Sequence, residues 1–346
     1  MSAPIDNARA AVAAPHVRRT RPAMKTPLRW LAALVVLATS LAVFAQAPAY
    51  PARPIRLIVP FPPGAGTDTV ARLVAQNLGQ AMNATIVVDN RTGAGGAIGA
   101  VEAARAEPDG YTLLFVAGPF TTVPAASRNP TYDPVRQFVP AASIATSPLV
   151  FVVNPAVPAA TMREFIALAK REPGRLNYGS AGPGSINHLA LVLFNARAGT
   201  DIVHVPYKGI APATLDLISG QIQAMTGTVS ATLPFIAEKK VRALAVTGAR
   251  RVPLLPGVPS WQEEGVTGAN VINYWGIVAP AGTPREIVLR LNAEVNRVLA
   301  QPEVRDRLEK EGAEITSGPP ERLGSIIEAD LAGWKKLIAE VKLQLD

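Results

Sequence analysis

The feature that most constrains the fold is the regular alternation of short apolar runs with amphipathic segments from Tyr50 onward. Short apolar runs bounded by turn residues are typical of buried strands, and apolar residues at i, i+3, i+4 spacing are typical of helices. Two helices, one beginning at Thr67-Asp68 and reaching about Met82 and one ending near Glu107, separate three strands. The pattern βαβαβ is typical of a doubly wound α/β sheet. The predicted strands are 55–60, 85–89 and 111–116.

The alternation then repeats, with no flexible linker between the first and the second α/β unit. This arrangement predicts two lobes joined by strands, with the chain crossing between them near 149–153 and 273–277. We assign 48–149 and 274–346 to lobe 1 and 150–273 to lobe 2, and we expect the C-terminal helices to pack on lobe 1. The further predicted strands are 149–153, 176–178, 202–205, 221–225, 241–246 and 275–279, and the further helices are 161–171, 186 onward, 211–219, 230–238, 284–300, 303–311 and 321–341.

The N-terminal region 1–47 carries the pattern of a secretory signal peptide. Lys25 and Arg29 precede a 15-residue apolar run, Trp30–Phe44, which is followed by Ala45-Gln46-Ala47. The signal proper covers about 24–47, with 1–23 as an upstream extension. An uncleaved membrane anchor is the alternative, but the run is shorter than the roughly 20 residues that a spanning helix needs. The sequence therefore predicts export to the periplasm and a mature chain beginning near Pro48.

Charge and composition exclude several classes of protein. The net charge of +8 falls to +3 without residues 1–47, which hold six basic residues and one acid, and no basic stripe interleaved with aromatics remains. A nucleic-acid partner is therefore not expected. The chain has no cysteine, and neither a phosphate-binding loop with its lysine nor an HExxH or GxSxG motif. We expect no cofactor, no metal ligands and no catalytic residues, although a site built of carboxylates alone stays open.

The glycine-rich stretch Gly93–Gly99 follows a predicted strand and opens a helix. Its spacing is not G-x-G-x-x-G, and it follows the second strand rather than the first. We interpret it as a tight turn that allows close helix–strand packing, with nicotinamide binding as the alternative.

Two other turns of small residues lead from a strand into a helix. One is VPFPPGAGTD, from Val59 to Asp68, and the other is YGSAGPGSINH, from Tyr178 to His188. Small residues let backbone N–H groups approach a ligand, and a helix N-terminus adds unpaired donors and partial positive charge. One such turn in each lobe suggests an anion held between them. Plain tight turns are the alternative.

The same residues resemble a known family. YPARPI at Tyr50, the two turns, NRxGAGG at Asn90, PDGY at Pro108 and VPYKG at Val205 occur in order, and WGIVAP at Trp275 continues the match. Together they are similar to the Bug (TctC-type) substrate receptors of tripartite tricarboxylate transporters. The resemblance covers Tyr50 to the C-terminus.

The resemblance implies an α/β fold of the two-lobed, type II periplasmic-binding-protein kind with a central ligand cleft. It also implies a monomeric receptor that captures a small organic acid and delivers it to integral-membrane permease subunits, without catalysis. Asp68 is expected to cap a helix or hold a water rather than contact the anion. Many relatives carry Asp where this chain has Gly227, so an amino-acid ligand is disfavoured here unless the change is ordinary loop variation. The expected ligand-binding residues are Phe61, Pro63, Gly64, Ala65, Gly66, Thr67, Asp68, Ser180, Ala181, Gly182, Gly184, Ser185, His188 and Thr228.

Two alternative functions use the same chain differently. A ligand-binding sensor that reports to a two-component system would have the same cleft. An exported α/β hydrolase or lyase would need a nucleophile–base pair, and no sequence motif provides one. His188 is interpreted as structural or as polar lining rather than as a base.

Overall fold

The computed structural model describes residues 50–64 and 66–343. The predicted signal peptide and Ala65 lie outside the described residues. By their internal contacts, the residues from Tyr50 onward form one unit. No helix in the described part of the chain has the length and apolar character needed to cross a membrane.

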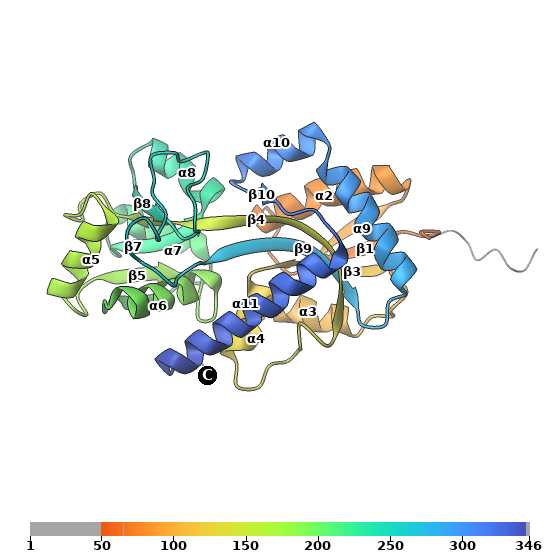
Figure 1. Cartoon of the computed structure of the whole chain (residues 1–346), viewed down its shortest axis with the longest axis horizontal. Coiled ribbons are helices and arrows are strands. Elements are labelled where there is room, and N and C mark those ends of the chain that lie inside the picture. Colours follow the sequence, from red (N-terminus) through yellow and green to blue (C-terminus); the bar gives the residue numbers. More distant parts are fainter. Residues whose placement is uncertain (1–49, 65, 344–346) are drawn as a thin grey trace, which may run out of the picture. The chain divides into compact units, whose positions relative to one another are not determined.

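The described strands form one ten-stranded sheet, in which β4 and β9 are the two long strands that link its ends (Figure 1). The order is β2-β1-β3-β9-β4-β7-β5-β6, and β8 and β10 also pair with β4. The strands are β1 (Ile55–Val59), β2 (Ile86–Asn90), β3 (Thr112–Ala117), β4 (Phe138–Val153), β5 (Asn177–Ser180), β6 (Val203–Pro206), β7 (Ala224–Thr228), β8 (Arg242–Val246), β9 (Ile272–Pro280) and β10 (Glu314–Ile315).

The strand directions bring two sets of carboxyl ends toward each other. β1 and β3 are parallel, and both pairings of β9, with β3 and with β4, are antiparallel, so β3 and β4 run the same way. β7 is antiparallel to β4 and parallel to β5. Ala117, at the end of β3, pairs with Trp275 of β9, which pairs in turn with Ala145 of β4. Thr228, at the end of β7, pairs with Leu149 of β4. The loops after these strands therefore meet near the middle of β4.

Helices cover the sheet and begin where local signals place them. In α5, for example, the Thr161 hydroxyl accepts from the backbone N–H of Glu164, and the Glu164 carboxylate accepts from Ala160 N, which forms a reciprocal cap. The helices are α2 (Gly66–Met82), α3 (Ala97–Ala104), α4 (Pro119–Ala126), α5 (Met162–Arg171), α6 (Ile186–Ala198), α7 (Ile210–Ser219), α8 (Val229–Ala237), α9 (Arg285–Leu299), α10 (Pro302–Lys310) and α11 (Pro320–Val341); a short 3₁₀ turn, η1 (Ala94–Gly96), precedes α3.

Separate hydrophobic clusters fill the two ends of the sheet. At one end, β1, α2, β3, α9 and α10 share a core, and at the other β4, α5, α6 and β7 share another. Helix α11 belongs to both ends: Leu323 and Ile327 lie with Phe120 and Tyr274, whereas Trp334 and Leu337 lie with the core of α5 and α6. The expectation that the C-terminal helices pack on lobe 1 therefore describes α9 and α10, but only half of α11.

Three elements differ from the sequence-based expectation: α4, the first part of β4, and the two-residue strand β10, which was not predicted. Helix α4 contains Pro124 and has Pro119 at its start, and these prolines conceal the helical pattern. Strand β4 begins 11 residues earlier than predicted, at Phe138 rather than Leu149. Its first part contains Pro140 and Pro148, and its pairing with β9 shifts register twice, so it does not show the simple apolar alternation of a strand.

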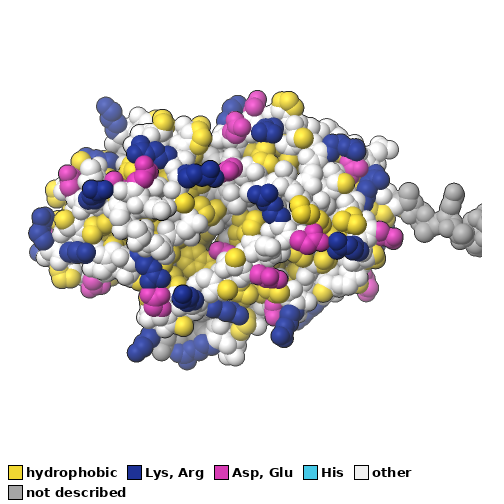
Figure 2. Space-filling model, viewed as in Figure 1, with side chains coloured by type: hydrophobic (Ala, Val, Ile, Leu, Met, Phe, Trp, Pro, Cys, Tyr) yellow, Lys and Arg dark blue, Asp and Glu magenta, His cyan; other side chains and the backbone are white. Residues whose placement is uncertain are grey.

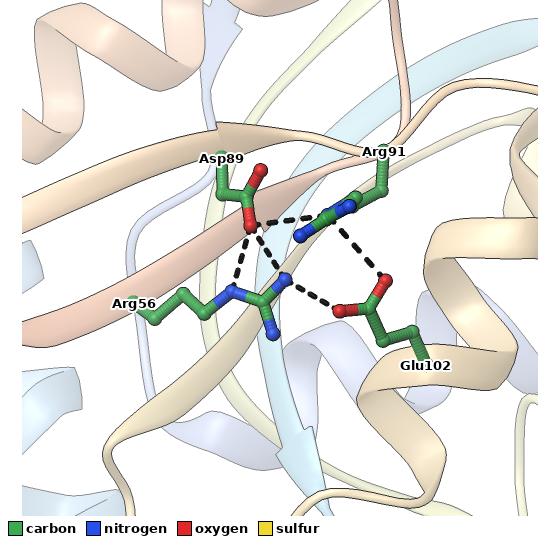
Figure 3. Close-up of polar contacts among 4 residues, drawn as sticks. All are labelled: Arg56, Asp89, Arg91 and Glu102. Atoms are coloured by element: carbon green, nitrogen blue, oxygen red, sulfur yellow. Dashed lines mark hydrogen bonds and ion pairs between the residues drawn. The ribbon is translucent and has the colours of Figure 1, made fainter.

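A charged network joins the edge of the sheet to α3 (Figure 3). Arg56 of β1 donates to Asp89 of β2 and to Glu102 of α3, and Arg91 lies between the same two carboxylates. Burial raises the pKa of the Asp89 carboxyl, but hydrogen bonds and charge from Arg56 and Arg91 outweigh it and lower that pKa. These charges satisfy one another, so we assign this network to the stability of the β1–β2–α3 unit.

Candidate functional site

Four helices begin where the oppositely directed strands end, and their first turns lie close together. α2 follows β1, α4 follows β3, α6 follows β5 and α8 follows β7. The first N–H groups of a helix have no partner within the helix, and they carry partial positive charge. The described structure thus directs the N-terminal ends of four helices, with the partial positive charge that they carry, toward one region of the sheet.

Side-chain and backbone contacts join these helix starts across the centre of the molecule. A Cβ placed on Gly66 would lie 4.0 Å from the Ser230 hydroxyl, so α2 and α8 begin side by side. A Cβ on Gly118 would lie 2.8 Å from Ile186, so α4 and α6 also begin in contact. The Asn187 amide donates to the carbonyl of Thr226, at 2.7 Å, and so joins α6 to the end of β7.

The first loop is held by Asp68, which is buried. Its carboxylate accepts from Gly64 N at 2.8 Å, from Arg72 Nε at 2.9 Å and from Asn90 Nδ2 at 2.8 Å. Burial raises the pKa of this carboxyl, but Arg72, Asn90 and the Gly64 amide together lower it below its ordinary value. Asp68 therefore fastens the first loop to Arg72 and Asn90, a role that differs from the helix cap or water ligand that the sequence suggested.

We expect Asp68→Ala to lower the free energy of unfolding by about 3 kcal/mol, because it removes a buried carboxylate that accepts from the Gly64 amide and from two side-chain donors. Chemical denaturation at pH 7 measures the change. Asp306→Ala, at an exposed position on α10, is the matched control and should change stability by less than about 0.5 kcal/mol. Equal effects of the two substitutions would contradict this role for Asp68.

The other residues predicted in the first loop lie at different depths. Phe61 is half-buried against the core of β1 and α2, and its carbonyl accepts from Asn90. Pro63 and Gly64 are exposed, and Gly64 has φ +78°, a conformation that favours glycine. The Thr67 hydroxyl accepts from Trp275 Nε1 at 3.2 Å, which leaves its own proton available to a ligand.

The second loop, residues 180–185, is folded around its own hydrogen bonds. Gly182 N donates to the Ser180 hydroxyl at 3.1 Å, and Gly184 N donates to His188 Nδ1 at 3.2 Å. The Ser185 hydroxyl donates to the Gly182 carbonyl and caps α6 by accepting from His188 N. Gly182 and Gly184 have φ of +114° and +74°. The amides of these two glycines, which the sequence suggested as anion donors, are thus engaged within the loop.

A stack of three rings supports this loop. The rings of His188 and His204 lie 4.0 Å apart, the ring of Tyr178 lies 5.0 Å from His204, and His204 Nε2 is 2.6 Å from the Ser180 hydroxyl. Burial lowers the pKa of both histidines to about 4, and for His188 the neighbouring His204 adds to the effect. Both rings are therefore neutral near pH 7.

The contact between Ser180 and His204 is a hydroxyl–imidazole pair that the sequence did not reveal. A nucleophile–base pair requires an accessible hydroxyl and a third group that orients the base. Ser180 is fully buried, and the partners of the His204 ring in the described structure are Ser180, Tyr178 and His188. We therefore interpret the contact between Ser180 and His204 as support for the second loop, not as a nucleophile–base pair.

At the end of β7, Thr228 caps α8 by accepting from Ala231 N at 3.3 Å. A Cβ at Gly227 would lie 2.5 Å from Thr232 Cγ2, so a side chain there would be directed at α8. Five residues beside these loops were not predicted: Asn187, His204, Ser230, Trp275 and Asn273, whose side-chain oxygen accepts from Gly118 N at the start of α4. Asn187 lies between the predicted residues Ser185 and His188, whereas no local sequence pattern marks the other four as site residues.

No group of three or more metal-ligating side chains occurs among residues 50–64 and 66–343. We therefore expect dialysis against EDTA to change the unfolding midpoint by less than about 1 °C, since stability changes only if a bound ligand is lost. Thermal unfolding before and after dialysis tests this, with restored calcium or zinc as the control. A midpoint that falls and recovers with metal would contradict the expectation.

Comparisons with known proteins identify a family that matches this chain. Residues 70–343 match the family described as the tripartite tricarboxylate transporter family receptor, TctC. Protein BugT of Bordetella pertussis is 34% identical over 302 residues, which cover 87% of this chain and 93% of BugT.

Two similar proteins of known structure have a dicarboxylate ligand. R. palustris Rpa4515 with adipate has a TM-score of 0.79 at 34% identity, and MatC from Rhodopseudomonas palustris with bound malate has a TM-score of 0.76 at 32% identity. The alignments cover 85% and 84% of this chain, and 99% and 100% of those chains. The α/β fold of the periplasmic binding proteins is thus confirmed. The chain belongs to the TctC family of tripartite tricarboxylate transporter receptors, the Bug proteins, which are solute-binding proteins rather than enzymes.

Proposed function

We propose that this protein is a periplasmic receptor that captures a small dicarboxylate at the meeting point of α2, α4, α6 and α8. The observation that carries the proposal is the convergence of these helix starts on loops that contain neither lysine nor arginine. Such a site binds an anion through dipoles and neutral donors. The adipate and malate bound by two relatives are both dicarboxylates, which supports this class of ligand.

The donors that we assign differ from those first expected in the second loop. Because the amides of Gly182 and Gly184 are engaged, we assign the carboxylate to the first-turn amides of α6 at Ile186 and Asn187. The hydroxyls of Thr67 and Thr228 each accept one hydrogen bond from the protein and so can donate their own proton. A dicarboxylate would then span the site, with one carboxylate at the start of α6 and the other near the starts of α2 and α8.

We also propose that the regions 48–149 with 274–346 and 150–273 act as lobes that close on the ligand. The strands β4 and β9 link the two regions, and they pair with each other where the chain passes from one region to the other, near 149 and 273. Closure of this kind is established for periplasmic binding proteins. Small-angle scattering should show a smaller radius of gyration with saturating ligand, and identical curves would indicate a rigid site.

The permease partner and the periplasmic location rest on the family and on the N-terminal signal pattern. A sensor role would use the same site, so the two differ in the protein that recognises the closed form. Reconstituted permease vesicles should accumulate the dicarboxylate only when the receptor is present.

Calorimetry on the purified protein tests the ligand class. We expect adipate or malate, or a dicarboxylate of similar length, to bind at least tenfold more tightly than acetate and than the matched diamine or amide. Tricarboxylates, aromatic acids and amino acids complete the panel. Binding of the neutral amides or amines in preference to every carboxylate would overturn the proposal.

A further inference from the structure

A groove of about 720 Å³ lies beside α11, on the face of β9 opposite the proposed dicarboxylate site. Side chains alternate along a strand, so Tyr274, which lines the groove, faces away from Asn273 and Trp275, which contact the starts of α4 and α2. Figure 2 shows the recess with hydrophobic side chains inside it and charged ones along its rim. Its apolar walls come from Leu193, Val266, Ile272, Ile326, Trp334 and Leu337.

One wall of the groove carries a carboxylate, Asp330 of α11. This side chain is largely buried, accepts from the Thr121 hydroxyl, and has no lysine, arginine or histidine partner among the described residues. Burial raises the pKa of the carboxyl to about 6, although Thr121 and the nearby indole of Trp334 act in the opposite direction. It is therefore charged at neutral pH without a counter-charge.

The two cations that line the groove are directed to another acid. Arg197 donates from both terminal nitrogens to the Glu340 carboxylate, and the charge of Lys336 helps to lower the pKa of the same carboxylate. Glu340 thus balances most of the charge of Arg197 and Lys336, and Asp330, inside the groove, has no cationic partner among the described residues. An unpaired buried carboxylate is costly and is more common at functional sites than elsewhere.

We propose that this groove is a second binding site, for a small ammonium compound with an aromatic or branched apolar body. The ammonium group pairs with Asp330 and lies against the rings of Tyr274 and Trp334, which attract cations. The apolar body covers the walls from α6 and from residues 266–272. The volume lies within the 300–1,000 Å³ that is typical of ligand pockets.

Calorimetry on the purified protein with three compounds of one shape tests the ligand class. The probes are 2-phenylethylamine, 2-phenylethanol and 3-phenylpropionate, at pH 7.5, and intrinsic tryptophan fluorescence, to which Trp334 contributes, gives a second readout. We expect the amine to bind at least tenfold more tightly than the alcohol and the propionate. Equal binding of the three compounds, or no binding of the amine at 5 mM, would overturn the proposal.

Variants on α11 locate the site. Asp330→Asn should weaken binding of the amine at least tenfold, while Glu328→Gln, at an exposed carboxyl on the same helix, leaves it unchanged. If Asp330→Asn does not fold, Gly333→Leu decides, because a Cβ at Gly333 meets nothing within 4 Å and the leucine would fill the groove. Gly333→Ala is its matched control. Full binding by the folded Gly333→Leu protein would contradict the assignment, and the dicarboxylate measurement is independent of it.

Discussion

Gly182→Val is expected to weaken dicarboxylate binding about a hundredfold. Gly182 has φ +114°, which disfavours any residue with a Cβ, and that Cβ would lie 3.3 Å from the carbonyl oxygen of Tyr207. The Gly182 carbonyl accepts from both the amide and the hydroxyl of Ser185. A shift at 182 therefore moves the cap of α6 and the donors behind it. Loss of two hydrogen bonds to a charged group, at about 1.5 kcal/mol each, corresponds to that factor.

Calorimetry with the best-binding dicarboxylate measures the effect. Gly265→Val is the matched control, because Gly265 also has a positive φ, +86°, and a Cβ there meets nothing within 4 Å. It should bind as the unmodified protein does. Ser185→Ala should cost about tenfold, since it removes one cap and leaves the amides of α6 in place. A folded Gly182→Val protein with unchanged affinity would show that this loop is not the site.

Acid is expected to destabilise the protein between about pH 6.5 and pH 4 through the stacked histidines. The pKa of His188 and that of His204 are lowered to about 4, below the ordinary value near 6.5 that the unfolded chain has. In this window the unfolded state binds more protons, so their contribution is complete above pH 6.5 and is lost as pH falls toward 4. We expect the two rings to account for about 3 kcal/mol, after allowance for their partial exposure to solvent.

Asp330 opposes this trend. Its folded pKa of about 6 lies above its unfolded value, so its contribution favours the folded state at low pH and is lost as pH rises through 6. The carboxyls of Asp68 and Asp89, whose pKa values are lowered, stabilise the fold above about pH 4 and lose that effect only in stronger acid. The window from about pH 5.5 to 7 therefore reports mainly the histidines and Asp330, because the carboxyls with lowered pKa values stay ionised in both states there.

Urea denaturation of three proteins across this window separates the contributions. His204→Gln keeps a polar partner for Ser180 but removes one titrating ring and relieves His188, so its stability should fall less than half as steeply toward acid. Asp330→Asn should fall more steeply than the unmodified protein. Parallel profiles of all three proteins would contradict the role assigned to the stack.

Much of the secondary structure was predictable because its signals are local. The strand at Ile55–Val59 is a short apolar run between turns, and α5 begins at a reciprocal cap between Thr161 and Glu164. Helix α4 and the first part of β4 were not predicted, because prolines interrupt the patterns and these segments depend on tertiary contacts, among them the pairing of β4 with β9 and packing against α11.

The candidate site was predictable only as two separate loops. Glycines with positive φ and a serine at the start of a helix leave a sequence signal, and Gly64, Gly182 and Ser185 were recognised by it. The engagement of the glycine amides was not predictable, since it depends on the side-chain conformations of Ser180, which accepts from Gly182 N, and of His188, which accepts from Gly184 N.

The sequence by itself determined the alternation of strands and helices, the two small-residue loops, the absence of cationic side chains from them, and a resemblance that the comparisons confirm. Each of these depends on neighbours in the chain. The tertiary structure alone decided which strand ends face each other, that His188 stacks on His204, and that Asp330 lies unpaired in a groove beside both cores. The physical reason is that stacking, burial and charge pairing act between residues far apart in sequence, and a local sequence pattern does not show which distant residues come into contact.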